Sequence, residues 1–301
     1  MAWKYWDPRP DWPEPRSYLY ERDGELQGHV ALWPAVWPPP GPRGVHMIDW
    51  AAVRESPGAG LAMVQKLARM YDFIIAIGGA EMTRKVLPAY GFAEVARTWM
   101  AARPLRPVAQ ALDHQSRNWK LPVRVVRNWW WSRSPAASAP AEWSASAITP
   151  AEIAVEAPAQ SIPRTPEFFA YLLGCPAARS SLYALRRGGK PEGHFALSVV
   201  RGQARLAGVW LRQPSEEAWR AAFLLAQRAA RAIAGANEFG AKGTDGASRR
   251  AAESAGLRMA GAGPVFLLDK KGLFPKVQEF QFQLIDDDGA FLDLGRADYL
   301  T

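Results

Sequence analysis

The chain of 301 residues is nearly devoid of cysteine and contains only Cys175. A single cysteine excludes an internal disulfide and any metal site built from several cysteines. Long apolar runs are also lacking, because no stretch approaches the ~20 apolar residues of a membrane span. Residues 1–20 contain no continuous apolar core of the kind that marks a secretory signal. We therefore expect a globular protein in a reducing, cytoplasmic setting.

Acidic residues are outnumbered by basic ones, since 37 Lys and Arg face 29 Asp and Glu, and the net charge is +8. This balance favours an anionic partner, such as a phosphorylated cofactor, nucleic acid or an anionic membrane surface. A basic surface without a specific partner is the alternative. The hydrophobic fraction of 49% is typical of a globular protein, and the length is sufficient for two domains.

The sequence repeats its own pattern at an offset of 165 residues, from Tyr18 to beyond Phe92, without a gap. The identical pairs include Tyr18/Tyr183, Gly24/Gly189, Gly28/Gly193, His29/His194, Ala31/Ala196, Leu32/Leu197, Gly78/Gly243, Arg84/Arg249 and Gly91/Gly256. An ungapped run of matching glycines and apolar positions indicates two copies of one fold.

Each copy is predicted to contain a hairpin, a strand, a long helix, a short strand, a short helix and a final strand. The hairpins turn at Asp23-Gly24 and Gly188-Gly189, which are typical tight-turn dipeptides. The fold class is therefore α/β (α+β), with two domains that each contain a mixed, mostly antiparallel sheet flanked by helices. The predicted boundaries are 1–106 for the first domain, 107–166 for a connector, 167–275 for the second domain and 276–301 for a C-terminal hairpin or tail.

The connector is basic and rich in tryptophan. Residues 117–133 carry five Lys or Arg and no acid, and Trp129–Trp131 are consecutive. Such a segment suits an anionic membrane surface or the stacked bases of nucleic acid. We favour a third interpretation, in which a helix and a strand pack their tryptophans on the two sheets. Residues 134–147 are small and are expected to form a flexible linker.

A glycine-bearing turn joins the strand at 44–53 to the long helix of the first copy. The helix is expected to begin near Pro57 or Gly58, with Ser56 as its cap. Backbone N–H groups at such a terminus form a binding site for a phosphate or pyrophosphate, and Gly58 and Gly60 allow close approach.

The order of elements, together with SPGAGLAMVQKL at 56–67 and IGGAEMTRKVLPAYGFAEV at 77–95, resembles the GNAT superfamily of N-acetyltransferases. That family binds acetyl-CoA with a loop of pattern [RQ]-x-x-G-x-[GA] at the start of its long helix. Gly58 and Gly60 match its two small positions, and Gly91-Phe92 match a later Gly-Phe. The resemblance implies acetyl-CoA, or another acyl-CoA, as co-substrate. The residues expected to hold it are Val53, Arg54, Ser56, Pro57, Gly58, Ala59, Gly60 and Leu61.

The sequence departs from the family pattern at several positions. Glu55 stands at the basic or glutamine position of the loop, and Leu87 stands where many members carry a tyrosine that protonates the thiolate. At the offset of 165 residues, Phe223 and Leu225 fall opposite Gly58 and Gly60. The second copy is therefore predicted to be degenerate, without a cofactor turn.

His46 and Asp49 are the candidate general bases, on opposite faces of the strand before the loop. Either could accept a proton from an ammonium group. The structural alternatives are a hydrogen-bonded, half-buried histidine and a turn acceptor, and these are favoured for each residue taken singly. The run Asp286–Asp288 is interpreted as a solvated turn and not as a metal site.

The predicted activity is transfer of an acetyl or other acyl group from CoA to an amine on a small molecule or peptide. Two alternatives stay open: a non-catalytic GNAT-like binding or scaffold protein, and a FemAB-type transferase that uses aminoacyl-tRNA. Nucleic acid and membrane partners are not expected, and the oligomeric state is left open.

Overall fold

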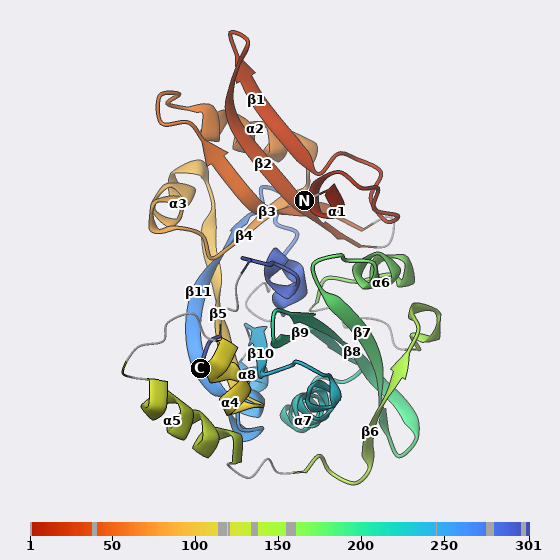
Figure 1. The fold of residues 1–301 in the computed structure, drawn as a ribbon. Coiled ribbons are helices and arrows are strands. Elements are labelled where there is room, and N and C mark those ends of the chain that lie inside the picture. The colour runs from red at the N-terminus through yellow and green to blue at the C-terminus, as the bar shows by residue number, and fades with distance from the viewer. Residues whose placement is uncertain are drawn as a thin grey trace.

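In the computed structural model, the chain folds around one continuous sheet (Figure 1). The structure describes residues 2–37, 41–113, 119, 121–133, 138–154, 161–244, 246–274, 280–295 and 299–301. The strands are β1 Ser17–Arg22, β2 Glu25–Val36, β3 Arg43–Ala52, β4 Phe73–Ile77, β5 Ala93–Pro104, β6 Trp143–Ile148, β7 Arg179–Arg187, β8 Lys190–Val200, β9 Gln203–Leu211, β10 Glu238–Gly243 and β11 Arg258–Leu268. The α-helices are α1 Ala2–Tyr5, α2 Ala59–Met70, α3 Glu81–Val86, α4 Pro107–Asp113, α5 Leu121–Arg133, α6 Pro166–Leu173, α7 Glu216–Ala232 and α8 Gly246–Ser254.

The element order predicted for the two copies is confirmed. Each half begins with a hairpin whose two turn residues have positive φ, namely 55° at Asp23 and 78° at Gly24, and 54° at Gly188 and 80° at Gly189. These left-handed conformations are those that a two-residue hairpin turn requires. In each half a parallel pair follows, β3 with β4 and β9 with β10, and a helix connects its two strands.

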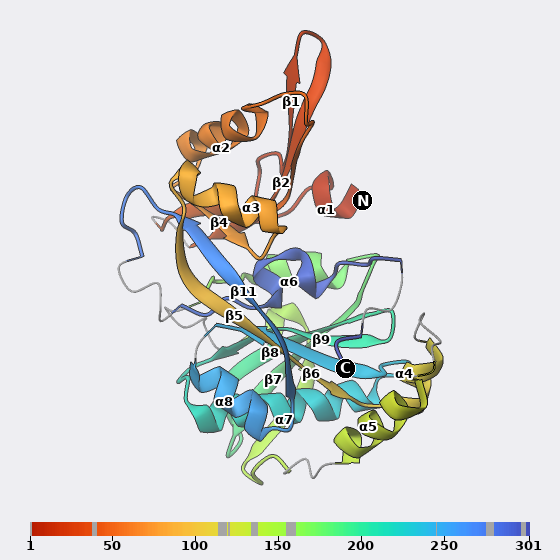
Figure 2. The ribbon, with the colours of Figure 1, turned by 90° about the vertical axis from the view of Figure 1, so that its left-hand side faces the viewer.

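The two halves exchange their last strands. The sheet order is β1-β2-β3-β4-β11-β5-β10-β9-β8-β7-β6, so β11 lies between β4 and β5, and β5 lies between β11 and β10. Figure 2 shows β5 and β11 side by side where they link the two halves. The two expected GNAT-like domains are thus present as halves of one sheet, each completed by a strand of the other.

Side chains on the exchanged strands extend into the opposite half. Arg103 of β5 is 1% exposed and donates to the Gln227 side-chain oxygen (3.2 Å) and the Ala255 carbonyl (3.3 Å), which belong to the second half. Val265 of β11 pairs with Ile77 of β4 and is completely buried. The cores of the halves therefore depend on each other.

A shared core also lies between the halves. It contains Trp3, Trp33, Phe168, Tyr171, Trp210, Ile285 and Phe291, among other side chains. The Trp33 indole donates to the Ile285 carbonyl (2.8 Å), which ties β2 to the C-terminal segment. That segment forms two short 3₁₀ turns, Leu284–Asp286 and Asp288–Ala290, where the sequence predicted a hairpin or tail over 276–301.

The run of three aspartates is not a solvated turn, because each carboxylate has its own cation. Asp286 pairs with Arg164 (2.8 Å), Asp287 pairs with Lys242, and Asp288 pairs with Lys4 (2.7 Å). Asp286 and Asp287 are buried, and their charge is therefore compensated by salt bridges and not by water. This pairing explains why a strongly acidic sequence can pack between the halves.

The connector also differs from its expected form. Trp143–Ile148, predicted within a flexible linker, forms β6 and pairs with β7 at the sheet edge. Trp119, Trp129 and Trp130 do not pack on the sheets but are 80%, 43% and 70% exposed. In the described part of the chain, no helix is long and apolar enough to cross a membrane.

The exchange predicts that the halves unfold together. We expect Val265→Ala to lower the free energy of unfolding by about 2 kcal/mol, because a buried side chain shared by β4 and β5 is truncated. Val108→Ala, at a position that is 59% exposed, should change it little. Far-ultraviolet circular dichroism and tryptophan fluorescence should follow one coincident denaturant transition in all variants. Two separated transitions would contradict the exchange.

Candidate functional site

The turn between β3 and α2 presents an open helix N-terminus. Gly58 caps α2 with a φ of 91°, and an added Cβ would meet no atom within 4 Å. The first bond of the helix is donated by Ala62 to the Gly58 carbonyl (2.9 Å), so the N–H groups of Gly60 and Leu61 precede the helical ladder. The positive end of the helix dipole therefore points to open space.

The predicted cofactor residues lie on this turn and on the first turn of α2, but Ser56 is not the cap. Gly58 occupies the cap position, and no side chain caps the helix. Ser56 is buried, and its carbonyl accepts from the Ala59 N–H (3.2 Å). Val53, Arg54, Pro57 and Gly58 are exposed, Ala59 is buried, and Gly60 and Leu61 are half-buried.

Gly60 serves packing more than ligand access. A Cβ at this position would lie 2.9 Å from the Trp50 ring, so only glycine lets the indole lie on the first turn of α2. The other side of the indole packs edge-on against Tyr90, with 5.9 Å between the ring centroids. Leu87, at the position of the family's tyrosine, is completely buried and offers no acid.

The strands β3 and β4 diverge next to this turn. Their parallel pairing covers only Gly44–His46 with Phe73–Ile75, whereas β3 continues to Ala52. At the point of divergence the Ile77 N–H donates to His46 Nε2 (3.0 Å). His46 therefore links the two strands where their backbone bonds end. We call the stretch beyond this point, where the facing backbone groups of β3 and β4 are not paired with each other, the slot.

This environment does not suit His46 as a general base. The side chain is buried, and burial lowers its pKa to about 3, so the ring is neutral at physiological pH. The Nε2 lone pair is already used by the Ile77 N–H. The geometry gives His46 the structural role that was the favoured alternative.

Asp49 lies on the same side of the sheet as His46 and not on the opposite face. The β2–β3 register shifts between Ala31 and Leu32, whose partners are Asp49 and Met47, so Ile48 forms a bulge. An extra residue reverses the alternation of side chains beyond it. Asp49 consequently faces α1 and the C-terminal turns, while Met47 packs under α2.

An ammonium group occupies the space beside Asp49. Lys4 Nζ lies 2.6 Å from Asp49 Oδ2 and 2.7 Å from Asp288 Oδ2, and the Tyr5 hydroxyl donates to the same Asp49 oxygen (2.7 Å). Among the described residues, Asp49 Oδ1 has no hydrogen-bond donor within reach. Asp49 keeps 40% of its side chain exposed, whereas Lys4 keeps 12%.

These contacts shift the pKa values of the group. Burial disfavours the charge of Lys4, but the Asp288 and Asp49 carboxylates outweigh it and raise the pKa of the ammonium above its ordinary value. Burial acts to raise the pKa of Asp49, yet hydrogen bonds from Lys4 and Tyr5 hold it below its ordinary value. Burial raises the pKa of Asp288. Asp49 is therefore ionised but already partly neutralised by a neighbour.

The second half has its own turn, at a place that the sequence offset misassigned. The bulge in β9 falls on Ala207, which corresponds to Ile48 at an offset of 159 and not 165. The turn before α7 is therefore Arg212–Ser215, and Phe223 and Leu225 lie deep within α7. The Ser215 hydroxyl accepts from the Ala218 N–H (3.1 Å), so this helix end is capped by its own chain.

The slot of the second half is filled by the C-terminal segment. Pairing of β9 with β10 ends at Arg205, as pairing of β3 with β4 ends at His46. Beyond it, the Gln283 side chain accepts from the Val209 N–H (2.7 Å) and donates to the Val209 carbonyl (3.0 Å). The Gln283 side-chain amide thus forms the hydrogen bonds with the Val209 N–H and carbonyl that a neighbouring strand or the amide of a ligand would otherwise form.

Sequence reasoning missed Lys4, Tyr5, Asp288 and Gln283, because none lies within the repeat. The short 3₁₀ turns and the four-residue α1 carry no periodic signal, and their partners are far away in the sequence. The one signal in the sequence that could have indicated ion pairing is the run of acids before Gly289.

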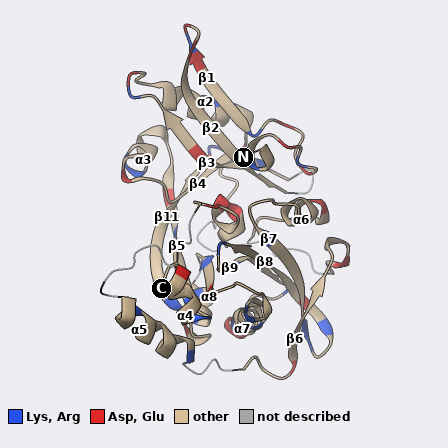
Figure 3. Ribbon diagram, in the orientation of Figure 1, with Lys and Arg blue, Asp and Glu red and all other residues tan. Residues whose placement is uncertain are grey.

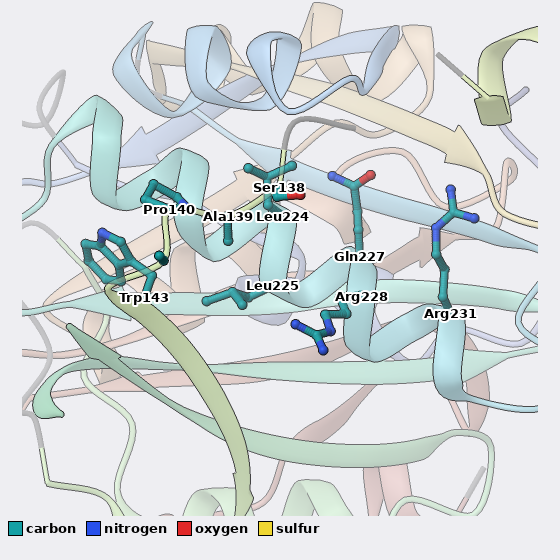
Figure 4. Close-up of a pocket in the computed structure, with 10 residues that line it drawn as sticks. Ser138, Ala139, Pro140, Trp143, Leu224, Leu225, Gln227, Arg228 and Arg231 are labelled. Carbon is teal, nitrogen blue, oxygen red and sulfur yellow. The ribbon is translucent and has the colours of Figure 1, made fainter. Parts of the chain in front are cut away.

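A cavity of about 460 Å³ lies elsewhere, in the second half between residues 138–143 and α7 (Figure 4). Its polar lining includes Ser138, Gln227, Arg228 and Arg231. It contains no carboxylate or histidine that could act as a base, so it does not add to the site formed by β3 and α2.

No family model and no curated protein matches the sequence. Solved structures of similar fold include the following two. A GCN5-related N-acetyltransferase from Anabaena variabilis has a TM-score of 0.53 and 11% identity, covering 85% of this chain but only 63% of that one. A tandem GNAT protein from the clavulanic acid biosynthesis pathway has a TM-score of 0.52 and 11% identity, covering 86% of this chain and 85% of that one.

Identities this low show the fold alone. The resemblance to the GNAT superfamily is confirmed at that level: the chain has the fold of the GCN5-related N-acetyltransferases, in two halves.

Proposed function

We propose that the protein transfers an acyl group from an acyl-CoA, with acetyl-CoA the first candidate, to a primary amine of a small molecule or peptide. The observation that carries the proposal is the open N-terminus of α2 in the first half, beside the diverging strands β3 and β4. Its N–H groups and the helix dipole suit the pyrophosphate of CoA, whereas the charges of the neighbouring exposed Arg54 and Glu55 offset each other.

The slot beyond His46 suits the extended arm of CoA. Trp50 corresponds to Val209, whose N–H and carbonyl both face the slot of the second half. The Trp50 peptide groups would thus face the first slot, where Gln283 has no counterpart among the described residues. An N–H at this position could polarise a thioester carbonyl.

Asp49 would receive the acceptor. The ammonium of the acceptor would bind the carboxylate where Lys4 Nζ now lies, and Asp49 Oδ1 would accept its proton directly or through water. The free amine would then attack the thioester carbon, forming the C–N bond and breaking the C–S bond. The second proton of the attacking nitrogen would pass through water to the departing thiolate, because Leu87 offers no acid.

A non-catalytic binding protein is the second candidate. The observation in its favour is that Lys4 and Tyr5 occupy Asp49, which weakens the carboxylate that the sequence offered as a general base next to the cofactor turn. Such a protein would bind acyl-CoA without turnover. The FemAB-type alternative has no specific contact in its favour within the described residues, and the cytoplasmic setting stays a prediction.

Substitutions at two glycines with positive φ and open space at Cβ can test the binding site. Gly58→Glu should weaken acetyl-CoA binding roughly tenfold or more, because its carboxylate would face the bound pyrophosphate. Gly24→Glu should leave binding unchanged, since Gly24 also has a positive φ (78°) and open space at Cβ but lies at the tip of the β1–β2 hairpin. Isothermal titration calorimetry should give one site per chain, because Gln283 fills the second slot.

The control removes backbone strain as an explanation, since both variants place a side chain in a left-handed conformation. No binding to the wild-type protein would refute the proposal. Two sites per chain, or equal loss in both variants, would show that the turn at Gly58 is not the cofactor site.

The roles of Asp49 and Lys4 can be separated by rate measurements. With a panel of primary amines and a colorimetric assay of released thiol, Asp49→Asn should lower the rate roughly 10²-fold or more without changing acetyl-CoA binding. Lys4→Met should raise kcat/KM for the amine, because it frees the carboxylate. Thiol release that is unaffected by Asp49→Asn would exclude Asp49 as the base, and acetyl-CoA binding without turnover of any amine would favour the non-catalytic candidate.

A further inference from the structure

The connector holds an unusual share of the exposed apolar side chains. Of the 16 large hydrophobic residues that are at least 36% exposed in the described part of the chain, seven lie between Pro107 and Arg133. We name these seven the connector patch. They are Val108, Leu112, Trp119, Val123, Val126, Trp129 and Trp130.

The helix α5 presents its apolar side outward. Val123, Val126 and Trp130 follow helical spacing along one side and are 66%, 67% and 70% exposed. On the side toward the protein, the buried Asn128 donates to the Gln110 side-chain oxygen (3.0 Å), and Leu121 and Val125 are half-buried. Apolar side chains therefore lie on both sides of α5, and the outward ones are suited to an apolar partner.

Cations without acids border the α5 part of the patch, whereas Asp113 follows Leu112 at the end of α4. The Arg127 guanidinium lies over the Trp131 ring (4.4 Å to the centroid), and that of Arg133 lies over Trp129 (3.7 Å). Between Asp113 and Glu142 the sequence contains five Lys or Arg and no acid, and Figure 3 shows no acidic residue on α5. The partner must therefore be both apolar and anionic.

The patch lies away from the turn between β3 and α2. In both Figure 1 and Figure 2, α4 and α5 are together at the end of the molecule opposite α2 and the β1–β2 hairpin. A surface that covered the patch would leave the cofactor turn uncovered.

We propose that α4 and α5 dock the protein on an anionic lipid bilayer, with the connector patch in the interfacial region and the arginines among the headgroups. Valine and tryptophan side chains partition into this region, and each Lys or Arg near an anionic surface adds attraction. A second copy of the chain would face the patch with like charges, which disfavours association. Nucleic acid would match the arginines and tryptophans but not the aliphatic stripe of Val123 and Val126.

Vesicle co-sedimentation tests this proposal and does not depend on the acyltransferase activity. The wild-type protein should bind phosphatidylcholine vesicles that contain roughly a third phosphatidylglycerol, with weaker binding at high salt and to phosphatidylcholine alone. The double variant Val126→Glu/Trp130→Glu should bind more than roughly tenfold more weakly. The matched control Leu19→Glu/Met82→Glu adds the same charge at side chains that are 66% and 70% exposed in the first half, and it should bind like the wild type.

A second pair of changes tests the charges. Arg127→Gln/Arg133→Gln should weaken binding to the anionic vesicles and reduce its dependence on salt. Circular dichroism would verify that each variant is folded. The proposal is overturned if the wild type does not bind anionic vesicles, or if the patch variant and its control lose binding equally. It is also overturned if the patch variant instead abolishes self-association measured by light scattering, or binding to a labelled single-stranded oligonucleotide.

Discussion

The exchange of β5 and β11 is the constraint on which the other features depend. Without β11, the strand β4 would have no partner on one side, and the slot next to it would lack a rigid wall. The same pairing joins two cores that would otherwise be small, and it places the C-terminal segment between the halves. Burial of hydrophobic side chains and continuous backbone pairing thus both hold the two halves together at the centre of the sheet.

The two halves illustrate how one backbone arrangement can serve ligand binding or stability. Both contain a bulged strand, a divergent parallel pair and a helix that begins near the divergence. In the first half the helix begins at an open glycine, whereas in the second it is capped by Ser215 and the slot is closed by Gln283. The chemical difference between the halves is therefore confined to a few side chains around a common frame.

The sequence allowed much of this frame to be predicted, because hairpin turns and apolar periodicity are local signals. It could not reveal the strand exchange, since the same strands would pair equally well within one copy. The bulge at Ile48 was also invisible, and it changed the side of the sheet that Asp49 faces. Its counterpart at Ala207 shows that the offset between the copies is 159 residues at this strand. Six residues, 37–42, separate β2 from β3 in the sequence and only two separate β8 from β9, whereas α7 is longer than α2, so the offset of 165 residues returns after the helix.

The exchanged strands have a consequence for the order in which the protein is made. The helix α2 and its turn belong to the first half, yet β11, which flanks β4, follows every other described strand in the sequence. Domains commonly fold as they leave the ribosome, but the first half can reach its final pairing only after β11 has emerged. Until then the edge of β4 is either unpaired or paired with β5 of the same half, so a product truncated before β11 would lack the native arrangement next to the site.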